Sequence, residues 1–185
     1  MTLAQFDVKT AFLNGDLDED IFMEQPYGFT DNTDRVCKLK KSLYGLKQAP
    51  RQWNKKFISF IKKFDLEQTL ADPCVFRMRS ENEELFVAIY VDDGIACSTN
   101  KQLLSEMLDF LKTNFEITTT DKLCFLGIEI ETDSDSVRIH QTGYASEVLK
   151  RFKMQECKPA ATPFDPNLSL SNELYDACEE ETEFP

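Results

Sequence analysis

The sequence has no run of 18 consecutive apolar residues among its 185 residues, so no segment is long enough to span a membrane as an apolar helix. The opening MTLAQFDVKT lacks the basic start and long apolar core of a signal peptide, which argues against secretion. The six cysteines are never closer than 21 residues, and this spacing excludes a paired-cysteine zinc or redox motif. Cys97 and Cys124 lie in apolar runs, which predicts reduced, buried thiols in a cytosolic or nuclear protein.

Charge of one sign is missing from two long stretches. The net charge of -12 by itself argues against a nucleic-acid partner. Residues 35–64 nevertheless contain no acid and ten bases, whereas residues 165–185 hold seven acids and no base. A basic face on an acidic chain fits contact with a phosphate backbone. A solvated helix surface explains the same basic segment equally well.

The hydrophobic pattern predicts an α+β fold, an antiparallel sheet with helices packed on one face. Strands are expected over residues 4–8, 20–25, 36–42, 74–79, 84–91, 95–99, 124–132 and 136–141. Helices are expected over residues 50–65, over 101–115, and from a capping Thr142 to about Lys153. In the first helix, Trp53 and Phe57 belong to an apolar stripe that we assign to the core. The composition from residue 159 onward predicts a linker or a disordered tail.

The stretch YVDDG places Asp92 and Asp93 at the end of an apolar strand. An Asp-Gly pair between two strands predicts a tight hairpin turn at Asp93-Gly94. A third carboxylate, Asp7, ends the first strand, and the three could meet at one sheet edge. Three carboxylates within about 5 Å would repel by roughly 3 kcal/mol per pair at an effective dielectric near 20. Divalent cations with oxygen ligands would offset this repulsion, and two such ions serve in-line phosphoryl chemistry.

Four motifs then occur in a characteristic order: FDVKTAFLNG, SLYGLKQAPRQW, YVDDG and FLGIEI. In order and spacing they resemble the reverse transcriptase of copia-type retrotransposons, over residues 5–185. The resemblance implies an RNA-directed DNA polymerase: a palm and the start of a thumb over residues 1–158, and an acidic linker or disordered tail over residues 159–185. The implied partners are an RNA or DNA template with its primer, dNTPs and other parts of a Pol polyprotein. The implied location is a cytoplasmic virus-like particle or the nucleus, with no membrane association.

The resemblance also implies roles for individual residues. Asp7, Asp92 and Asp93 would be catalytic and, with the backbone of Val8, would hold two Mg²⁺ or Mn²⁺ ions. The residues expected to bind the incoming nucleotide are Phe12, Tyr44, Gly45 and Lys47. Those expected to contact primer and template are Tyr90, Lys55, Lys56, Phe125, Leu126 and Gly127. Phe12 would exclude a ribose 2′-hydroxyl, although a plain core phenylalanine is the alternative.

One departure from the family pattern bears on activity. Met1 stands six residues before Asp7, so we expect the fingers segment that binds the triphosphate to be missing and the activity to be weak or absent. The chain would then be a degenerate copy, a gene fragment or a piece of a longer polyprotein. Two alternatives stay open: a noncatalytic remnant that binds nucleic acid through residues 35–64, and a palm-like nucleotidyl cyclase. The cyclase accounts for the carboxylates but leaves the YGLKQAP segment unexplained.

Overall fold

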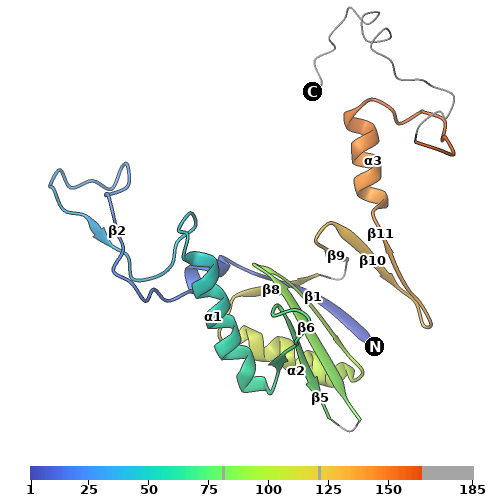
Figure 1. Cartoon of the computed structure of the whole chain (residues 1–185), viewed down its shortest axis with the longest axis horizontal. Coiled ribbons are helices and arrows are strands. Elements are labelled where there is room, and N and C mark those ends of the chain that lie inside the picture. The colour runs from blue at the N-terminus through green and yellow to red at the C-terminus, as the bar shows by residue number, and fades with distance from the viewer. Residues whose placement is uncertain (81, 121, 164–185) are drawn as a thin grey trace, which may run out of the picture. The chain divides into compact units, whose positions relative to one another are not determined.

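The computed structural model describes residues 1–163 except 81 and 121, and most of the predicted tail (residues 164–185) lies outside the described residues (Figure 1). The chain divides into two units, Met1–Arg138 and Ile139–Pro185. The strands are β1 (Thr2–Val8), β2 (Phe22–Met23), β3 (Cys37–Lys38), β4 (Glu67–Gln68), β5 (Val75–Arg79), β6 (Glu84–Tyr90), β7 (Asp93–Ser98), β8 (Ile117–Thr120), β9 (Leu123–Phe125), β10 (Ile128–Thr132) and β11 (Val137–His140). The α-helices are α1 (Ala49–Ile61), α2 (Lys101–Lys112) and α3 (Thr142–Arg151), and short 3-10 turns cover Ala11–Asn14 and Lys62–Phe64.

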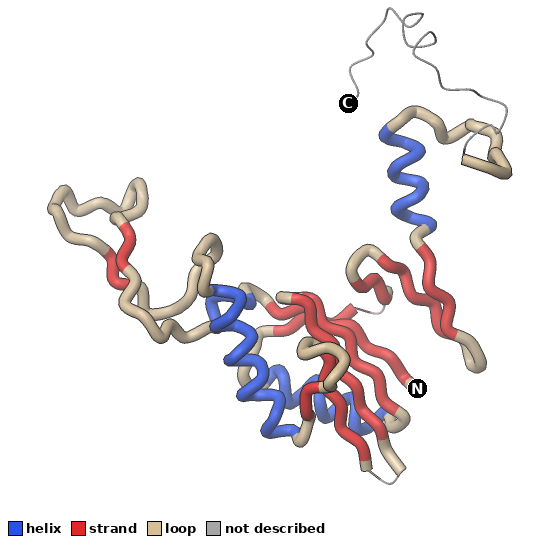
Figure 2. Tube along the Cα trace, in the orientation of Figure 1, coloured by secondary structure: helices blue, strands red, loops and turns tan. Residues whose placement is uncertain are grey.

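The first unit is built on a six-stranded sheet in the order β4-β5-β6-β7-β1-β8. Each pair of neighbouring strands in this sheet is antiparallel. Figure 2 shows α1 and α2 beside this sheet, and their buried side chains join the buried side chains of one sheet face in a single core. The structure is therefore a mixed α and β fold with antiparallel sheets, as the sequence predicts.

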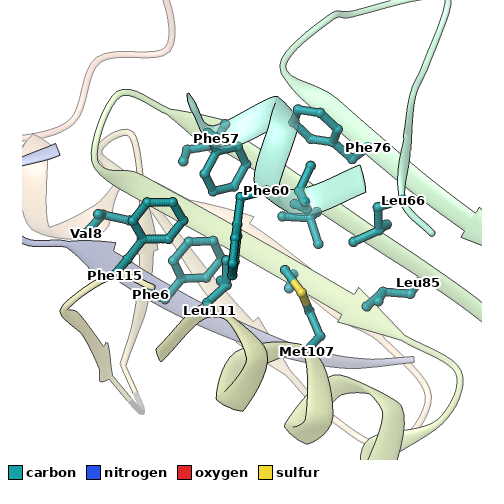
Figure 3. Close-up of a cluster of buried hydrophobic side chains, with 14 of the residues drawn as sticks. Phe6, Val8, Phe57, Phe60, Leu66, Phe76, Leu85, Met107, Leu111 and Phe115 are labelled. Carbon is teal, nitrogen blue, oxygen red and sulfur yellow. The ribbon is translucent and has the colours of Figure 1, made fainter. Parts of the chain in front are cut away.

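The core lies between the two helices and one face of the sheet (Figure 3). Phe6 and Val8 on β1 point into it because alternate residues of a strand face the same side. Trp53 and Phe57 on α1 meet them from the helix side, which confirms that the aromatic stripe belongs to the core. Asp7, between Phe6 and Val8, must consequently face the opposite side of the sheet.

Several predicted boundaries are wrong. The predicted strands 20–25 and 36–42 shrink to the short pair β2 and β3, and β8 was not predicted. The predicted strand 124–132 is broken into β9 and β10 by a turn at Leu126-Gly127, where both residues have positive φ, 51° and 76°. Gln141, not Thr142, holds the N-cap position of α3. The five described cysteines are unpaired, but Cys124 is exposed, which contradicts its predicted burial.

The second unit contains α3, which buries none of its residues. Tyr144 and Phe152 are about half exposed, at 57% and 48%. None of the described helices is both long and apolar enough to cross a membrane.

Candidate active site

The end of β1 and the β6–β7 turn lie side by side. In the antiparallel register, Asp7 on β1 stands directly opposite Asp93 on β7. One residue further on, the Val8 N–H donates a hydrogen bond of 2.9 Å to the carbonyl oxygen of Asp92. Cross-strand partners point their side chains to the same face, so Asp7 and Asp93 share the sheet face opposite the helices. The structure thus brings the three predicted carboxylate residues to one end of the sheet.

The turn itself is shifted from its predicted place. Tyr90 pairs with Asp93, so the two loop residues are Val91 and Asp92, and Asp93-Gly94 already belongs to β7. Val91 has a φ of 56°, which is strained for a β-branched side chain. A positive φ at the first loop residue alone is the pattern of a type II′ turn. Gly94 serves packing instead, because a Cβ there would lie 2.1 Å from the Phe6 ring.

Trp53 supports this turn from inside the core. Its indole Nε1–H donates a hydrogen bond of 2.6 Å to the carbonyl oxygen of Val91. The same indole packs edge-on against Phe115, with ring centroids 5.2 Å apart. Sequence periodicity assigned Trp53 to the core but gave no sign of this polar contact. The strained residue is therefore fixed by a donor that the core itself holds in place.

The carboxylates influence one another electrostatically. Partial burial raises the pKa of the Asp93 carboxyl above its ordinary value, and the negative charges of Asp92 and Asp7 raise it further. Negative charges held close together repel one another, and a bound cation would reduce that repulsion. Within the described part of the chain, however, no three His, Cys, Asp or Glu side chains are gathered closely enough to hold a metal by themselves.

Of the residues predicted to bind the nucleotide, Phe12 lies near this end of the sheet and contacts Tyr44. Phe12 packs against Tyr44, with ring centroids 4.9 Å apart. Phe12 also lines a cavity of about 200 Å³ together with Trp53, Tyr90 and Val91, so it lies beside the turn. Tyr44, Gly45 and Lys47 are all exposed, and Gly45 has a φ of 94°, which favours glycine. A larger cavity, about 760 Å³, is lined by residues between 65 and 79 and includes none of the predicted site residues.

The predicted primer-contacting hairpin has a two-residue tip. Phe125 pairs with Ile128, and Leu126 and Gly127 form the loop between them. Leu126 is 48% exposed at this tip. The hairpin is attached to β1 through Gln5, whose side-chain amide bonds to the backbone of Cys124 in both directions. The sequence analysis does not select Gln5. The only sequence feature that points to it is its polar side chain on the same strand face as Asp7.

The basic segment is partly neutralised by neighbouring acids. Four of its ten bases form ion pairs at the surface: Arg35 with Asp31, Lys38 with Asp20, Lys55 with Asp18 and Lys56 with Asp16. The structure therefore places the predicted primer-template residues Lys55 and Lys56 against acids of the chain's own 16–18 loop. The other six bases make no ion pair with any described residue. Exposed pairs of this kind contribute little stability.

Comparison with known proteins identifies the family. The model for reverse transcriptase (RNA-dependent DNA polymerase) matches residues 1–166. The chain therefore belongs to the reverse transcriptase family.

The relatives of this chain include polyproteins of plant transposons. The retrovirus-related Pol polyprotein from transposon TNT 1-94 of Nicotiana tabacum is 42% identical over 98% of this chain and 14% of its own length. The corresponding protein from transposon RE1 of Arabidopsis thaliana is 36% identical over 91% of this chain and 12% of its own length. A putative transposon Ty5-1 protein of Saccharomyces cerevisiae is 28% identical over 85% of this chain. The chain thus spans about one seventh of the plant polyproteins or less.

Proposed function

We propose that this chain is the part of a retrotransposon Pol polyprotein that carries the polymerase centre, and that it adds deoxynucleotides to a primer on an RNA or DNA template. The observation that carries the proposal is the pairing of Asp7 with Asp93 beside the Val91-Asp92 turn. Membership of the reverse transcriptase family supports the same reaction.

The metal ions of this proposal are Mg²⁺ or Mn²⁺. The residues that would hold them are Asp7, Asp92 and Asp93, with the backbone of Val8. Their carboxylates are hard oxygen ligands, and the raised pKa of Asp93 suits a site that gains a cation. Magnesium is usually bound by one or two carboxylates together with substrate phosphates, which fits the lack of a three-ligand group among the described residues. When bound, two such ions would activate the primer 3′-hydroxyl and neutralise charge on the triphosphate.

The remaining residues of the site would orient the substrates. Phe12 and Tyr44, packed on each other, would form the wall against the sugar of the incoming nucleotide, where a bulky ring excludes a 2′-hydroxyl. Gly45 and the exposed Lys47 would approach its phosphates. Tyr90, 60% exposed beside the turn, would contact the primer end.

Other substrate contacts would lie further from the carboxylates. Phe125, Leu126 and Gly127 would contact the primer strand at the hairpin tip. Lys55 and Lys56 would reach phosphates once released from their ion pairs with Asp18 and Asp16. These contacts would position the primer end against the strand that carries Asp7.

The test is primer extension by the purified chain on an oligo(dT)-primed RNA template, with Mg²⁺ and Mn²⁺ in parallel. Asp92→Asn should abolish metal-dependent incorporation, because the variant loses a carboxylate at the turn. Asp109→Asn is the matched control: Asp109 is exposed on α2, paired with Lys112, and the variant should extend the primer like the parent chain. Equal activity of Asp92→Asn and the parent chain would refute the assignment.

The competing function, nucleic-acid binding without catalysis, gives a different result. Binding through the bases of residues 35–64 would weaken steeply with salt and would be the same in Asp92→Asn. Primer-template binding without incorporation in either metal would favour that function over the polymerase. Incorporation that Asp92→Asn abolishes would exclude it.

A further inference from the structure

We infer that Gln5 is a positioning residue, whose side-chain amide fastens the β9–β10 hairpin to the strand that carries Asp7. This inference rests on the proposed function, because it assigns the hairpin tip to the primer. Gln5 itself would touch neither substrate nor metal. Its role would be to fix how far the tip stands from the carboxylates.

The contact is reciprocal. Gln5 Nε2 donates a hydrogen bond of 2.8 Å to the carbonyl oxygen of Cys124, and the Cys124 N–H donates one of 2.6 Å to Gln5 Oε1. The two residues are 119 positions apart in the sequence, and Gln5 is only 8% exposed. A single side chain therefore forms the same pair of bonds that a neighbouring strand would form.

The register of the hairpin explains why Cys124 can take part. Phe125 and Ile128 flank the two-residue loop, so they form the hydrogen-bonded pair that closes it. Bonded and non-bonded pairs alternate along antiparallel strands, so the next pair, Cys124 with Glu129, is not bonded across the hairpin. The N–H and C=O of Cys124 consequently point outward from the edge of β9. Gln5 satisfies both of these groups.

Only an amide side chain meets this requirement at that length. Glutamine offers a donor and an acceptor on one planar group, whereas an ionised glutamate accepts only and a leucine offers neither. An asparagine is one methylene shorter. The identity of residue 5 therefore follows from the geometry of the hairpin rather than from packing alone.

The consequence is a fixed connection between two parts of the proposed site. Gln5 precedes Asp7 by two residues on the same strand face, a rise of about 6.8 Å along the strand. On the other side of the contact, Cys124 precedes the exposed tip residue Leu126 by two positions. Loss of the amide would free the tip to move relative to Asp7 while leaving the carboxylates in place.

Two variants and one control test the inference. Gln5→Leu removes donor and acceptor, and Gln5→Met removes the amide donor and acceptor while keeping the length of the unbranched side chain, so it serves if the leucine variant folds poorly. Cys124→Ala is the matched control, because it removes the thiol and keeps both backbone groups. The first readout is hydrogen exchange of the Cys124 amide, which needs no catalysis. The second readout is the pair of KM values in primer extension, one for primer-template and one for dNTP.

Both Gln5 variants should exchange the Cys124 amide at least tenfold faster, with the amide of Phe6 unchanged. They should raise the KM for primer-template about tenfold to a hundredfold and leave the KM for dNTP as in the parent chain. Cys124→Ala should keep the parent chain's exchange rate at residue 124 and its KM for primer-template. Unchanged exchange at Cys124, or faster exchange with an unchanged KM for primer-template, would overturn the inference. A parent chain that extends no primer would instead refute the proposed function, while the exchange rates still decide whether the contact exists.

Discussion

Replacing Trp53 with phenylalanine tests whether the core holds the turn between β6 and β7. The variant keeps an aromatic ring against Phe115 but loses the indole N–H, which lies 2.6 Å from the carbonyl oxygen of Val91. Leaving a partly buried carbonyl without its donor costs about 1–3 kcal/mol. Val91 is also strained by about 1–3 kcal/mol at its φ of 56°. Without the bond from Trp53, the variant lacks one contact that holds Val91 in this conformation.

We therefore expect Trp53→Phe to lower the free energy of unfolding by about 1–3 kcal/mol in urea, with an unchanged m-value. It should also lower the kcat of primer extension, because the turn carries Asp92. Phe115→Leu is the matched control: it disturbs the same aromatic cluster without touching the Val91 carbonyl, and it should cost stability with little effect on kcat. A Trp53→Phe variant as stable and as active as the parent chain would refute the reasoning.

Three other changes follow from the same region. Because the pKa of Asp93 is raised in the folded chain, the native state holds the Asp93 proton more tightly than the unfolded state does. Without metal, the free energy of unfolding should therefore fall as the pH rises from the ordinary aspartate pKa through the raised value. Asp93→Asn should remove this pH dependence in urea titrations. Gly94→Ala should destabilise the chain by about 1–3 kcal/mol in the same assay, since its Cβ would meet the buried Phe6 ring at 2.1 Å; no loss of stability would mean that the ring can move aside. Phe12→Ala should raise ribonucleotide incorporation relative to deoxynucleotides by at least about tenfold, and an unchanged ratio would assign Phe12 to the core alone.

Local sequence patterns predicted the elements that bury large apolar faces, and they failed where long-range packing decides the structure. The apolar stripe of α1 and the alternation in β6 locate the core because burial requires that spacing. The Asp93-Gly94 pair misled the turn prediction, because Gly94 is required by the ring of Phe6 on another strand. No local pattern could reveal this contact.

The candidate site shows the same division. The strand pattern and the family motifs both selected Asp7, Asp92 and Asp93, and the register then placed Asp7 opposite Asp93 at one end of the sheet. The contacts that hold these residues were not visible, because each joins elements far apart in the sequence: Trp53 to Val91 across 38 positions and Gln5 to Cys124 across 119. Periodicity describes a residue's own element and says nothing about its partner on another.

Three unfavourable features lie in the region of the proposed chemistry. Val91 is strained at the turn, Leu126 has a φ of 51° at the hairpin tip, and Asp93 is held beside other negative charges. A distant, buried side chain donates a hydrogen bond at each strained loop: Trp53 to the turn, and Gln5 to Cys124 near the hairpin tip. Strain persists only where surrounding structure fixes it, and such places gather at functional sites. The buried donors therefore link the stability of the core to the placement of the carboxylates and the hairpin tip.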